Sequence, residues 1–247
     1  MTTWKTIKAR IDPLNLKKGH YRPGNPWGFP TIYKQDIHVK KLVPFGNKTF
    51  QGTAHFFLDD FKFERVWNTP KRYIKTLKKY KNGVLSPDFS LYVDYPLALQ
   101  IYNVYRNRWC GRYWQDQGIK VIPTVGWSTP ESYNFCFEGI EHNSTVAVSS
   151  IGVMQSKEAL KLFRKGFKEM TLRIDPENIL FYGKIPTRLV NKSTKTVNIK
   201  KFEDFATQRI QKWGEEDPDD KSAVHNITPS RMKQGCNCGN ANYNKAV

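Results

Sequence analysis

Residues 84–127 have the sequence VLSPDFSLYVDYPLALQIYNVYRNRWCGRYWQDQGIKVIPTVGW, and this stretch decides the fold. It begins with a short apolar run at 84–90 and ends with a second one at 120–127. Between them lies a long helical pattern that Pro96 opens and Gly118 closes. A buried strand, a helix and another buried strand are typical of a parallel βαβ unit. This part of the chain is therefore predicted to be α/β.

The same alternation continues on both sides of this unit. Further apolar runs are TAHFFLDD (53–60), STVAVSS (144–150) and NILFYG (178–183), with KKLVPF (40–45) as a short edge strand and one more strand expected within 190–205. Helices are predicted after Thr69-Pro70 and after Ser156, and a shorter one over 130–140. We therefore expect a mostly parallel sheet of about five or six strands with crossover helices, open or incomplete barrel-like. A doubly wound sheet stays an alternative.

The organisation changes towards both ends of the chain. Residues 1–41 are basic and rich in Pro, Gly and aromatics, which predicts an irregular arm that packs a few rings onto the domain. Residues 42–206 form the predicted α/β domain, and 207–247 the predicted polar tail. A short helix is expected at 205–213. The CxC pair of the tail, Cys236 and Cys238, lacks the partners of a zinc site.

The charge is strongly positive and unevenly spread. The net charge is +18, with ten Lys and Arg against two acids in residues 1–50 and eight against one in residues 61–82. Such surfaces attract polyanions, although basic residues also serve solubility. No apolar stretch reaches the roughly 18 residues of a membrane span, and the start MTTWKTIKAR lacks a signal-peptide core. A cytoplasmic location without membrane contact is therefore expected.

Cations and rings alternate in KRYIKTLKKYKNG (71–83), as in surfaces that contact phosphates and bases. The candidate nucleic-acid contacts are Lys71, Arg72, Lys75, Lys78, Lys79, Arg108 and Arg112. The solvated side of an amphipathic helix gives the same pattern. Arg108 and Arg112, four residues apart, either clamp a phosphate or pair with acids of a neighbouring element.

Acids and hydroxyls follow the predicted strands, whose carboxyl ends share one rim. The candidate catalytic residues are Asp59, Asp60, Asp88 and Glu131, with Asp60 and Asp88 as candidate ligands of Mg²⁺ or Mn²⁺. A carboxylate pair could instead act on a glycosidic bond, and an Asp after a strand often caps its own turn. Ser90, Thr124, Trp127 and Ser149 are candidate ligand-binding residues, and Trp127 could equally cover the core.

The chain resembles a known family in HFFLDDFKFERVWN, LSPDFSLYVDYPLALQIYNVYRNRWCG, QGIKVIPTVGWSTPESYNFCFEGI, TVAVSSIGV and FYG. These words are similar to the domain of unknown function 4417 family over about residues 40–185. The resemblance implies a bacteriophage or mobile-element protein inside a bacterial host, and it supplies no catalytic residues. From the charge distribution we expect nucleic-acid binding through the basic surface. Whether the protein is an enzyme stays open in the sequence; if it is one, metal-dependent phosphodiester chemistry at the rim is the first reaction to test. The alternatives are an enzyme or sensor for a nucleotide or sugar phosphate, and an inhibitor or adaptor of an acidic host protein.

Overall fold

The computed structural model describes residues 12–19, 21, 24–47, 49–187, 189 and 198–204. The chain divides into two compact units, 1–202 and 203–247, and the first contains all the elements named below. The strands are β1 (Leu42–Pro44), β2 (Thr53–His55), β3 (Val84–Leu85), β4 (Val121–Ile122), β5 (Thr145–Ser149), β6 (Asn178–Tyr182) and β7 (Asn198–Phe202). The helices are α1 (Arg65–Asn68), α2 (Pro70–Leu77), α3 (Leu97–Asp116) and α4 (Lys157–Ile174), with 3₁₀ turns η2 (Asp60–Lys62), η3 (Pro130–Asn134) and η4 (Val153–Gln155).

All strand pairs are parallel and follow chain order. β1, β2, β3 and β4 form one sheet, and β5, β6 and β7 form another. A parallel bridge between Thr124 and Ala147 joins the two sheets. Sequential order with crossovers of one hand places the helices on one face, whereas a doubly wound sheet covers both. The expected open, barrel-like α/β fold is confirmed, and within the described residues no pairing closes the sheet.

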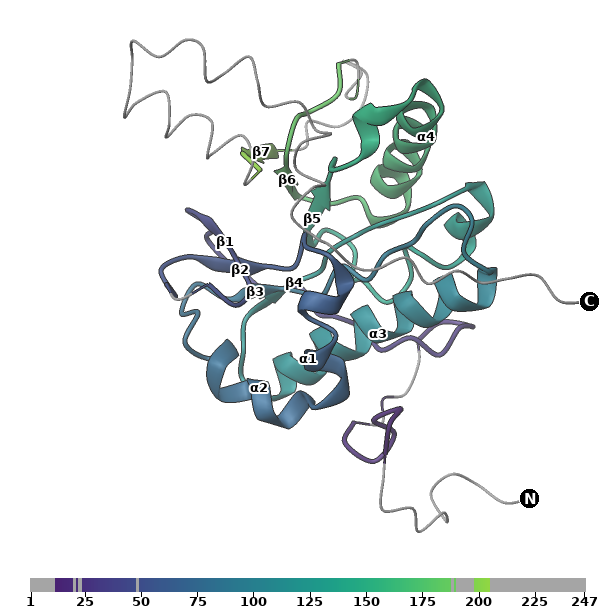
Figure 1. Ribbon diagram of the computed structural model, residues 1–247. Coiled ribbons are helices and arrows are strands. Elements are labelled where there is room, and N and C mark those ends of the chain that lie inside the picture. Colours follow the sequence, from purple (N-terminus) through teal and green to yellow (C-terminus); the bar gives the residue numbers. More distant parts are fainter. Residues whose placement is uncertain are drawn as a thin grey trace, which may run out of the picture. The chain divides into compact units, whose positions relative to one another are not determined.

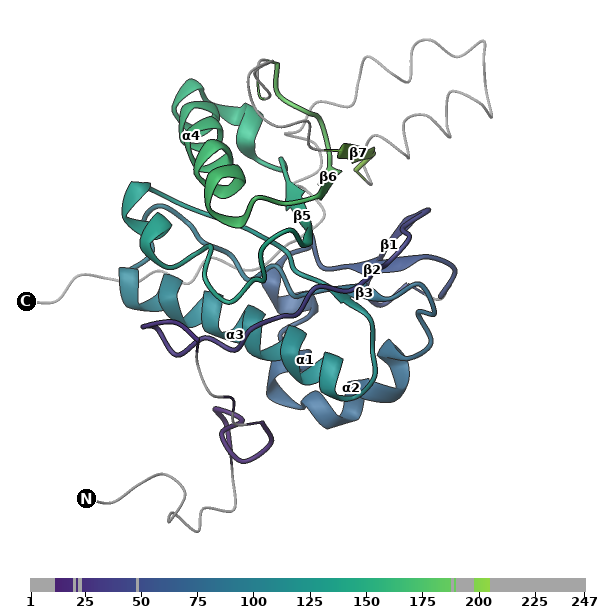
Figure 2. The ribbon, with the colours of Figure 1, turned by 180° about the vertical axis from the view of Figure 1, so that it is seen from behind.

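Side chains alternate between the two faces of the sheets, as the pleat requires. The outer face packs against α1, α2 and α3 on the β1–β4 sheet and against α4 on β5 and β6 (Figure 1). The view from behind shows the same arrangement (Figure 2). The inner face carries its own apolar cluster, which includes Leu42, Leu85, Ile122, Ala147, Leu180 and Tyr182. Of two consecutive residues in a strand, one therefore packs against the helices on the outer face, and the next packs in the apolar cluster on the inner face.

The helix ends follow the capping signals with two differences. α4 begins at Lys157, directly after Ser156 as predicted, and the Ser156 side-chain oxygen accepts a hydrogen bond from the Ala159 amide. α2 begins at Pro70, but the Thr69 hydroxyl donates to the Arg65 carbonyl of the preceding α1, which the sequence did not predict. The helix expected over 130–140 is the shorter 3₁₀ turn η3.

α3 buries apolar side chains, including Val104, Trp109, Tyr113 and Trp114. Leu97 and Leu99, at its first turn, are exposed. Its buried side also carries polar side chains, namely Gln100, Asn103, Arg106, Asn107 and Arg108. These residues bind the loops that leave the strands, as described below. No helix of the described residues is both long enough and apolar enough to cross a membrane.

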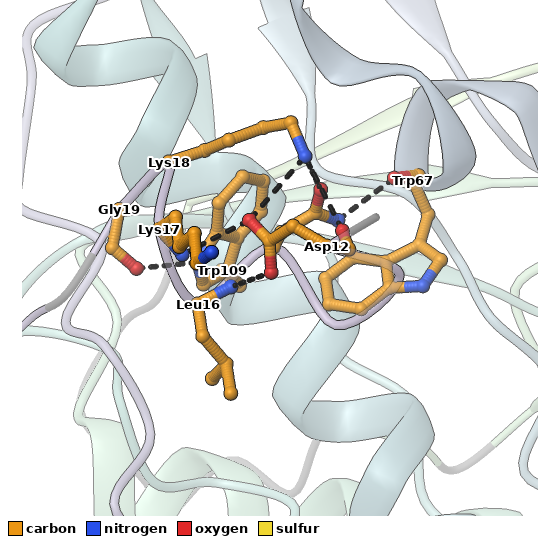
Figure 3. Close-up of polar contacts among 8 residues, drawn as sticks. Asp12, Leu16, Lys17, Lys18, Gly19, Trp67 and Trp109 are labelled. Atoms are coloured by element: carbon orange, nitrogen blue, oxygen red, sulfur yellow. Dashed lines mark hydrogen bonds and ion pairs between the residues drawn. The ribbon is translucent and has the colours of Figure 1, made fainter. Parts of the chain in front are cut away.

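The N-terminal segment packs on the domain through polar and apolar contacts. The Asp12 carboxylate accepts the backbone amides of Leu16 and Lys17, and the Trp109 indole donates to the Gly19 carbonyl (Figure 3). The buried Asn15 amide donates to the carbonyl of Trp67. Further along, Phe29, Ile32 and Val39 enter the three apolar clusters. The helix expected at 205–213, the tail from 207 and both CxC cysteines lie outside the described residues.

Candidate functional site

The loops that follow β2, β3, β4 and β5 enclose one cavity of about 480 Å³. Its volume lies within the roughly 300–1,000 Å³ that is common for small-molecule sites. Its polar lining includes Asp59, Lys62, Asp88, Ser90 and Ser149. Its aromatic lining consists of Phe57, Phe89, Tyr92, Trp127 and Phe163. The carboxyl ends of the strands therefore meet at a hollow with both rings and carboxylates.

Asp88 is a half-buried carboxyl of this polar lining. Its side chain borders the cavity and is otherwise surrounded by protein, and this desolvation raises the pKa of its carboxyl to about 7. The charge of nearby Asp60 adds to the increase. A second hollow of only about 10 Å³ lies behind Asp88, bordered by Asn103, Asn107 and Arg108. Asp88 is thus a carboxyl that changes protonation near neutral pH at the wall of the cavity.

Asp60 is held by the loop that follows the neighbouring strand. Its two carboxylate oxygens accept the backbone amide and the hydroxyl of Ser90, at 3.1 and 2.9 Å. The Asn103 side chain of α3 donates to the Ser90 carbonyl at 2.7 Å. Asp60 therefore does not cap its own turn, and instead fixes the start of the β3 loop against the β2 exit.

The other two candidate acids are on the surface. Asp59 forms an exposed ion pair with Lys62, with 2.7 Å between the carboxylate oxygen and the ammonium nitrogen. Glu131 is exposed at the start of η3, where a hydrogen bond with the Thr129 side chain lowers the pKa of its carboxyl. Among the described residues, no three His, Cys, Asp or Glu side chains group closely enough to hold a metal ion. The four acids predicted at the rim therefore do not converge as one cluster.

The four candidate ligand-binding residues have different positions. Ser90, Trp127 and Ser149 line the cavity, and the Trp127 ring also packs on Phe163 at 5.0 Å between ring centroids. Thr124 is buried, and its hydroxyl donates to the Ser86 carbonyl at 2.8 Å. Thr124 thus joins the β3 and β4 exits and does not reach the cavity.

The comparisons with known proteins match the part of the chain that forms the cavity. The family model for the domain of unknown function (DUF4417) matches residues 21–203. This chain belongs to the DUF4417 family. It is 40% identical to the "Gene 1 protein" of Mycobacterium phage L5 over 189 residues, which cover 74% of this chain and 82% of the relative. It is 42% identical to the "Gene 1 protein" of Mycobacterium phage D29 over 229 residues, covering 87% and 82%. No solved structure matches significantly.

In this DUF4417 protein, the cations of α2 and the turn after it are solvent-exposed. They are Lys71, Arg72, Lys75, Lys78 and Lys79 of the predicted set, together with Lys81, and we call them the α2 surface. The rings among them do not share that exposure. Tyr80 is buried, and Tyr73 packs edge-on against Phe45. Stacking of bases on these two tyrosines, which the sequence suggested, does not fit the structure, whereas contacts to phosphates do.

The two predicted arginines of α3 have structural partners. Arg108 is buried, and its guanidinium donates to the carbonyls of Glu138, Thr124 and Cys136 and to the Asn107 side chain. Arg112 forms an ion pair with Asp116, four residues along the helix, at 2.9 Å. Arg108 is therefore not part of the proposed nucleic-acid surface. The Asp116 partner could have been found from its i,i+4 spacing.

Two buried amides of α3 were missed by the sequence analysis. The Asn107 side chain donates to the carbonyls of Pro87 and Thr124 and accepts from the Ser86 hydroxyl. Together with Asn103 it holds the loop that carries Asp88 and Ser90. Both residues occur among aromatics and arginines in the helical pattern, and no motif distinguishes them there. The DUF4417 match covers the whole cavity, these amides and the α2 surface.

Proposed function

We propose that this phage-type protein binds nucleic acid through the α2 surface. The observation that carries the proposal is the exposure of six neighbouring cations, none of which forms an ion pair with an acid of the described residues. Lys71, Lys75 and Lys78 recur at i, i+4 and i+7, so they follow one side of the helix. Such a row matches a phosphate backbone, and its contacts release counterions.

The experiment is a binding titration with labelled single- and double-stranded DNA and RNA at several salt concentrations. The logarithm of affinity for duplex DNA falls with a slope of about −0.9 per neutralised phosphate. Replacing Lys71, Lys75 and Lys78 together by Gln should therefore flatten that slope by about 3. Lys34→Gln is the matched control, because Lys34 is already paired with Glu177 at 2.8 Å. Absence of binding, or an unchanged slope in the triple variant, would contradict the proposal.

A second cationic face lies on α4. Its exposed lysines are Lys157, Lys161, Lys165 and Lys168. The same titration with these four replaced by Gln shows whether α4 contributes to the polyanion contact. Recovery of a bacterial protein that stays bound after nuclease digestion would instead support the acidic-partner alternative.

Metal-dependent phosphodiester chemistry is a separate and narrower proposal. It rests on Asp60 and Asp88, which lie close enough for one charge to raise the pKa of the other. Mg²⁺ is often held by one or two carboxylates together with substrate phosphates. Cleavage of a labelled oligonucleotide in Mn²⁺ or Mg²⁺, lost in Asp60→Asn and retained in Asp59→Asn, would support it. Cleavage that is unchanged in Asp60→Asn, or absent in the wild type, would contradict it.

A further inference from the structure

The cavity has an unusual combination of polar and apolar groups. Its carboxylates belong to Asp59 and Asp88, and its cation, Lys62, is paired with Asp59. A phosphate would therefore meet a carboxylate and a neutralised ammonium. The lining thus disfavours the anionic small ligand that the sequence allowed, and favours a ligand that donates hydrogen bonds.

Asp88 is the group that needs such a donor. Among the described residues, no backbone or side-chain group donates a hydrogen bond to its carboxylate. A carboxylate has two oxygens in one plane, which fit two parallel N–H donors. The carboxylate is half-buried and lines the cavity, so a ligand in the cavity can reach its free hydrogen-bonding positions.

The apolar part of the lining indicates a flat ring. Phe57, Phe89 and Trp127 surround the cavity, and Gly126 leaves space opposite Asp88. A Cβ added at Gly126 would lie 3.8 Å from a carboxylate oxygen of Asp88, which is ordinary contact distance. Aromatic walls with a small number of convergent polar groups are typical of heterocycle sites.

We propose that the cavity binds a guanine-type base, with its adjacent ring N–H and amino groups on the Asp88 carboxylate and its ring among the aromatic side chains. The base comes from a nucleoside or from an unpaired strand. In the second case the inference deepens the proposed nucleic-acid function and rests on it. Enzymes and binding proteins that read an extruded base use the same combination of edge hydrogen bonds and stacking.

The mouth of the cavity supports the unpaired strand as the source. Tyr92 and Ile151 line the cavity and are 57% and 58% exposed, and Phe61, next to Asp60, is 77% exposed. Exposed apolar side chains gathered at a cavity mark a contact surface. A ring there can stack on a neighbouring base. Duplex DNA does not offer unstacked bases to such a site.

The test measures binding of guanosine, inosine and adenosine by calorimetry with EDTA present, so that no metal contributes. Guanosine should bind, and inosine, which lacks the amino group, should bind at least about tenfold more weakly. Asp88→Asn should weaken guanosine binding about 10- to 100-fold, because a charged hydrogen-bond acceptor is lost. Asp94→Asn, an exposed carboxylate that does not line the cavity, should leave it within about twofold.

Variants at two further positions keep the test independent of folding defects. Gly126 has no left-handed backbone conformation, so Gly126→Val should fold and place its side chain in the cavity, abolishing binding. Trp127→Ala removes a ring from the wall and should weaken guanosine binding, whereas Trp127→Phe, which keeps a ring, should weaken it less.

The source of the base is settled by a second arm with a G-containing single strand, an abasic version of it, and the same sequence as a duplex. An advantage of the intact single strand that disappears in Asp88→Asn supports the strand as source. Guanosine binding without strand binding supports the cavity and contradicts the proposed function of the α2 surface. Strand binding that depends on the α2 lysines but not on Asp88, with no guanosine binding, would overturn this inference and leave the proposed function intact.

Discussion

Asp60 accepts two hydrogen bonds from Ser90, one from its backbone amide and one from its hydroxyl, across thirty positions of the chain. The contact joins the exit of β2 to the exit of β3. It also orients the loop that carries Asp88, because the Ser90 carbonyl is held by Asn103 of α3. The floor of the cavity is thus built from three elements that are distant in sequence.

Asp60→Ala should destabilise the protein by about 2 kcal/mol, since hydrogen bonds to a charged acceptor contribute roughly 1.5–3 kcal/mol. Chemical denaturation measures the loss. Asp59→Ala is the matched control, because its exposed ion pair with Lys62 contributes at most about 1 kcal/mol. Equal losses in the two variants would show that the Ser90 contact does not hold the loop.

Trp127 packs on Gly166 of α4, where an added Cβ would overlap the indole. Gly166→Ala should therefore displace the ring and cost about 1–3 kcal/mol, with a change in tryptophan fluorescence. Replacing Trp127 by Leu should relieve much of that cost, which a double-mutant cycle measures. Lys165→Ala, on the exposed side of the same helix, should change stability by less than about 0.5 kcal/mol. Additive effects of the Gly166 and Trp127 substitutions would contradict the contact.

Much of the fold follows from local patterns in the sequence. The apolar runs became parallel strands, and Ser156 and Pro70 open helices as their chemistry predicts. These signals are local, because a cap bonds within one turn and a strand pattern repeats every second residue. The helix predicted over 130–140 is only the short 3₁₀ turn η3, because a Pro and a cap residue mark where a helix starts but do not determine how many turns follow.

The candidate site was predictable in its location but not in its contacts. Parallel strands imply a shared rim, and Asp88, Ser90 and Trp127 line the cavity at that rim. The partners of Arg108 and Asn107 are backbone carbonyls of distant loops, which leave no trace in residue type. The lack of a hydrogen-bond donor to the Asp88 carboxylate among the described residues likewise depends on how distant parts of the chain pack around it. Such facts arise only from tertiary packing.

His55 should make the protein less stable in mild acid. It is buried beside Phe57 and Tyr182 on the inner face, and desolvation lowers its pKa from 6.5 to about 4. Between these values the unfolded chain binds a proton that the folded chain does not, so stability rises with pH by up to about 1.4 kcal/mol per unit. His55→Asn should remove this slope in denaturation curves from pH 4 to 6.5. His38→Asn, at an exposed position, should keep it, and a slope that persists in His55→Asn would contradict the assignment.

Asp88 should act in the opposite direction. Its pKa is raised from 3.8 to about 7, so in this window the folded chain holds a proton that the unfolded chain has lost. Its contribution to stability is therefore present below about pH 4 and is lost as pH rises to 7. Asp88→Asn removes the ionisation, and its stability relative to wild type should increase with pH up to about 7 and then stay level. A constant difference between the two proteins across this range would show that Asp88 titrates normally.

Arg108 should behave as a structural residue. Arg108→Met leaves the carbonyls of Thr124, Cys136 and Glu138 without their donor, at about 1–3 kcal/mol each, so a loss of at least 3 kcal/mol is expected. Arg108→Lys should also be destabilising, because a single ammonium cannot reproduce the planar fork of donors. Arg112→Met, which loses one partly exposed ion pair, should cost about 1 kcal/mol. A different result would contradict this role: Arg108→Lys would be as stable as the wild type but bind nucleic acid more weakly. In that case the guanidinium would bind a phosphate and would not hold the loop carbonyls.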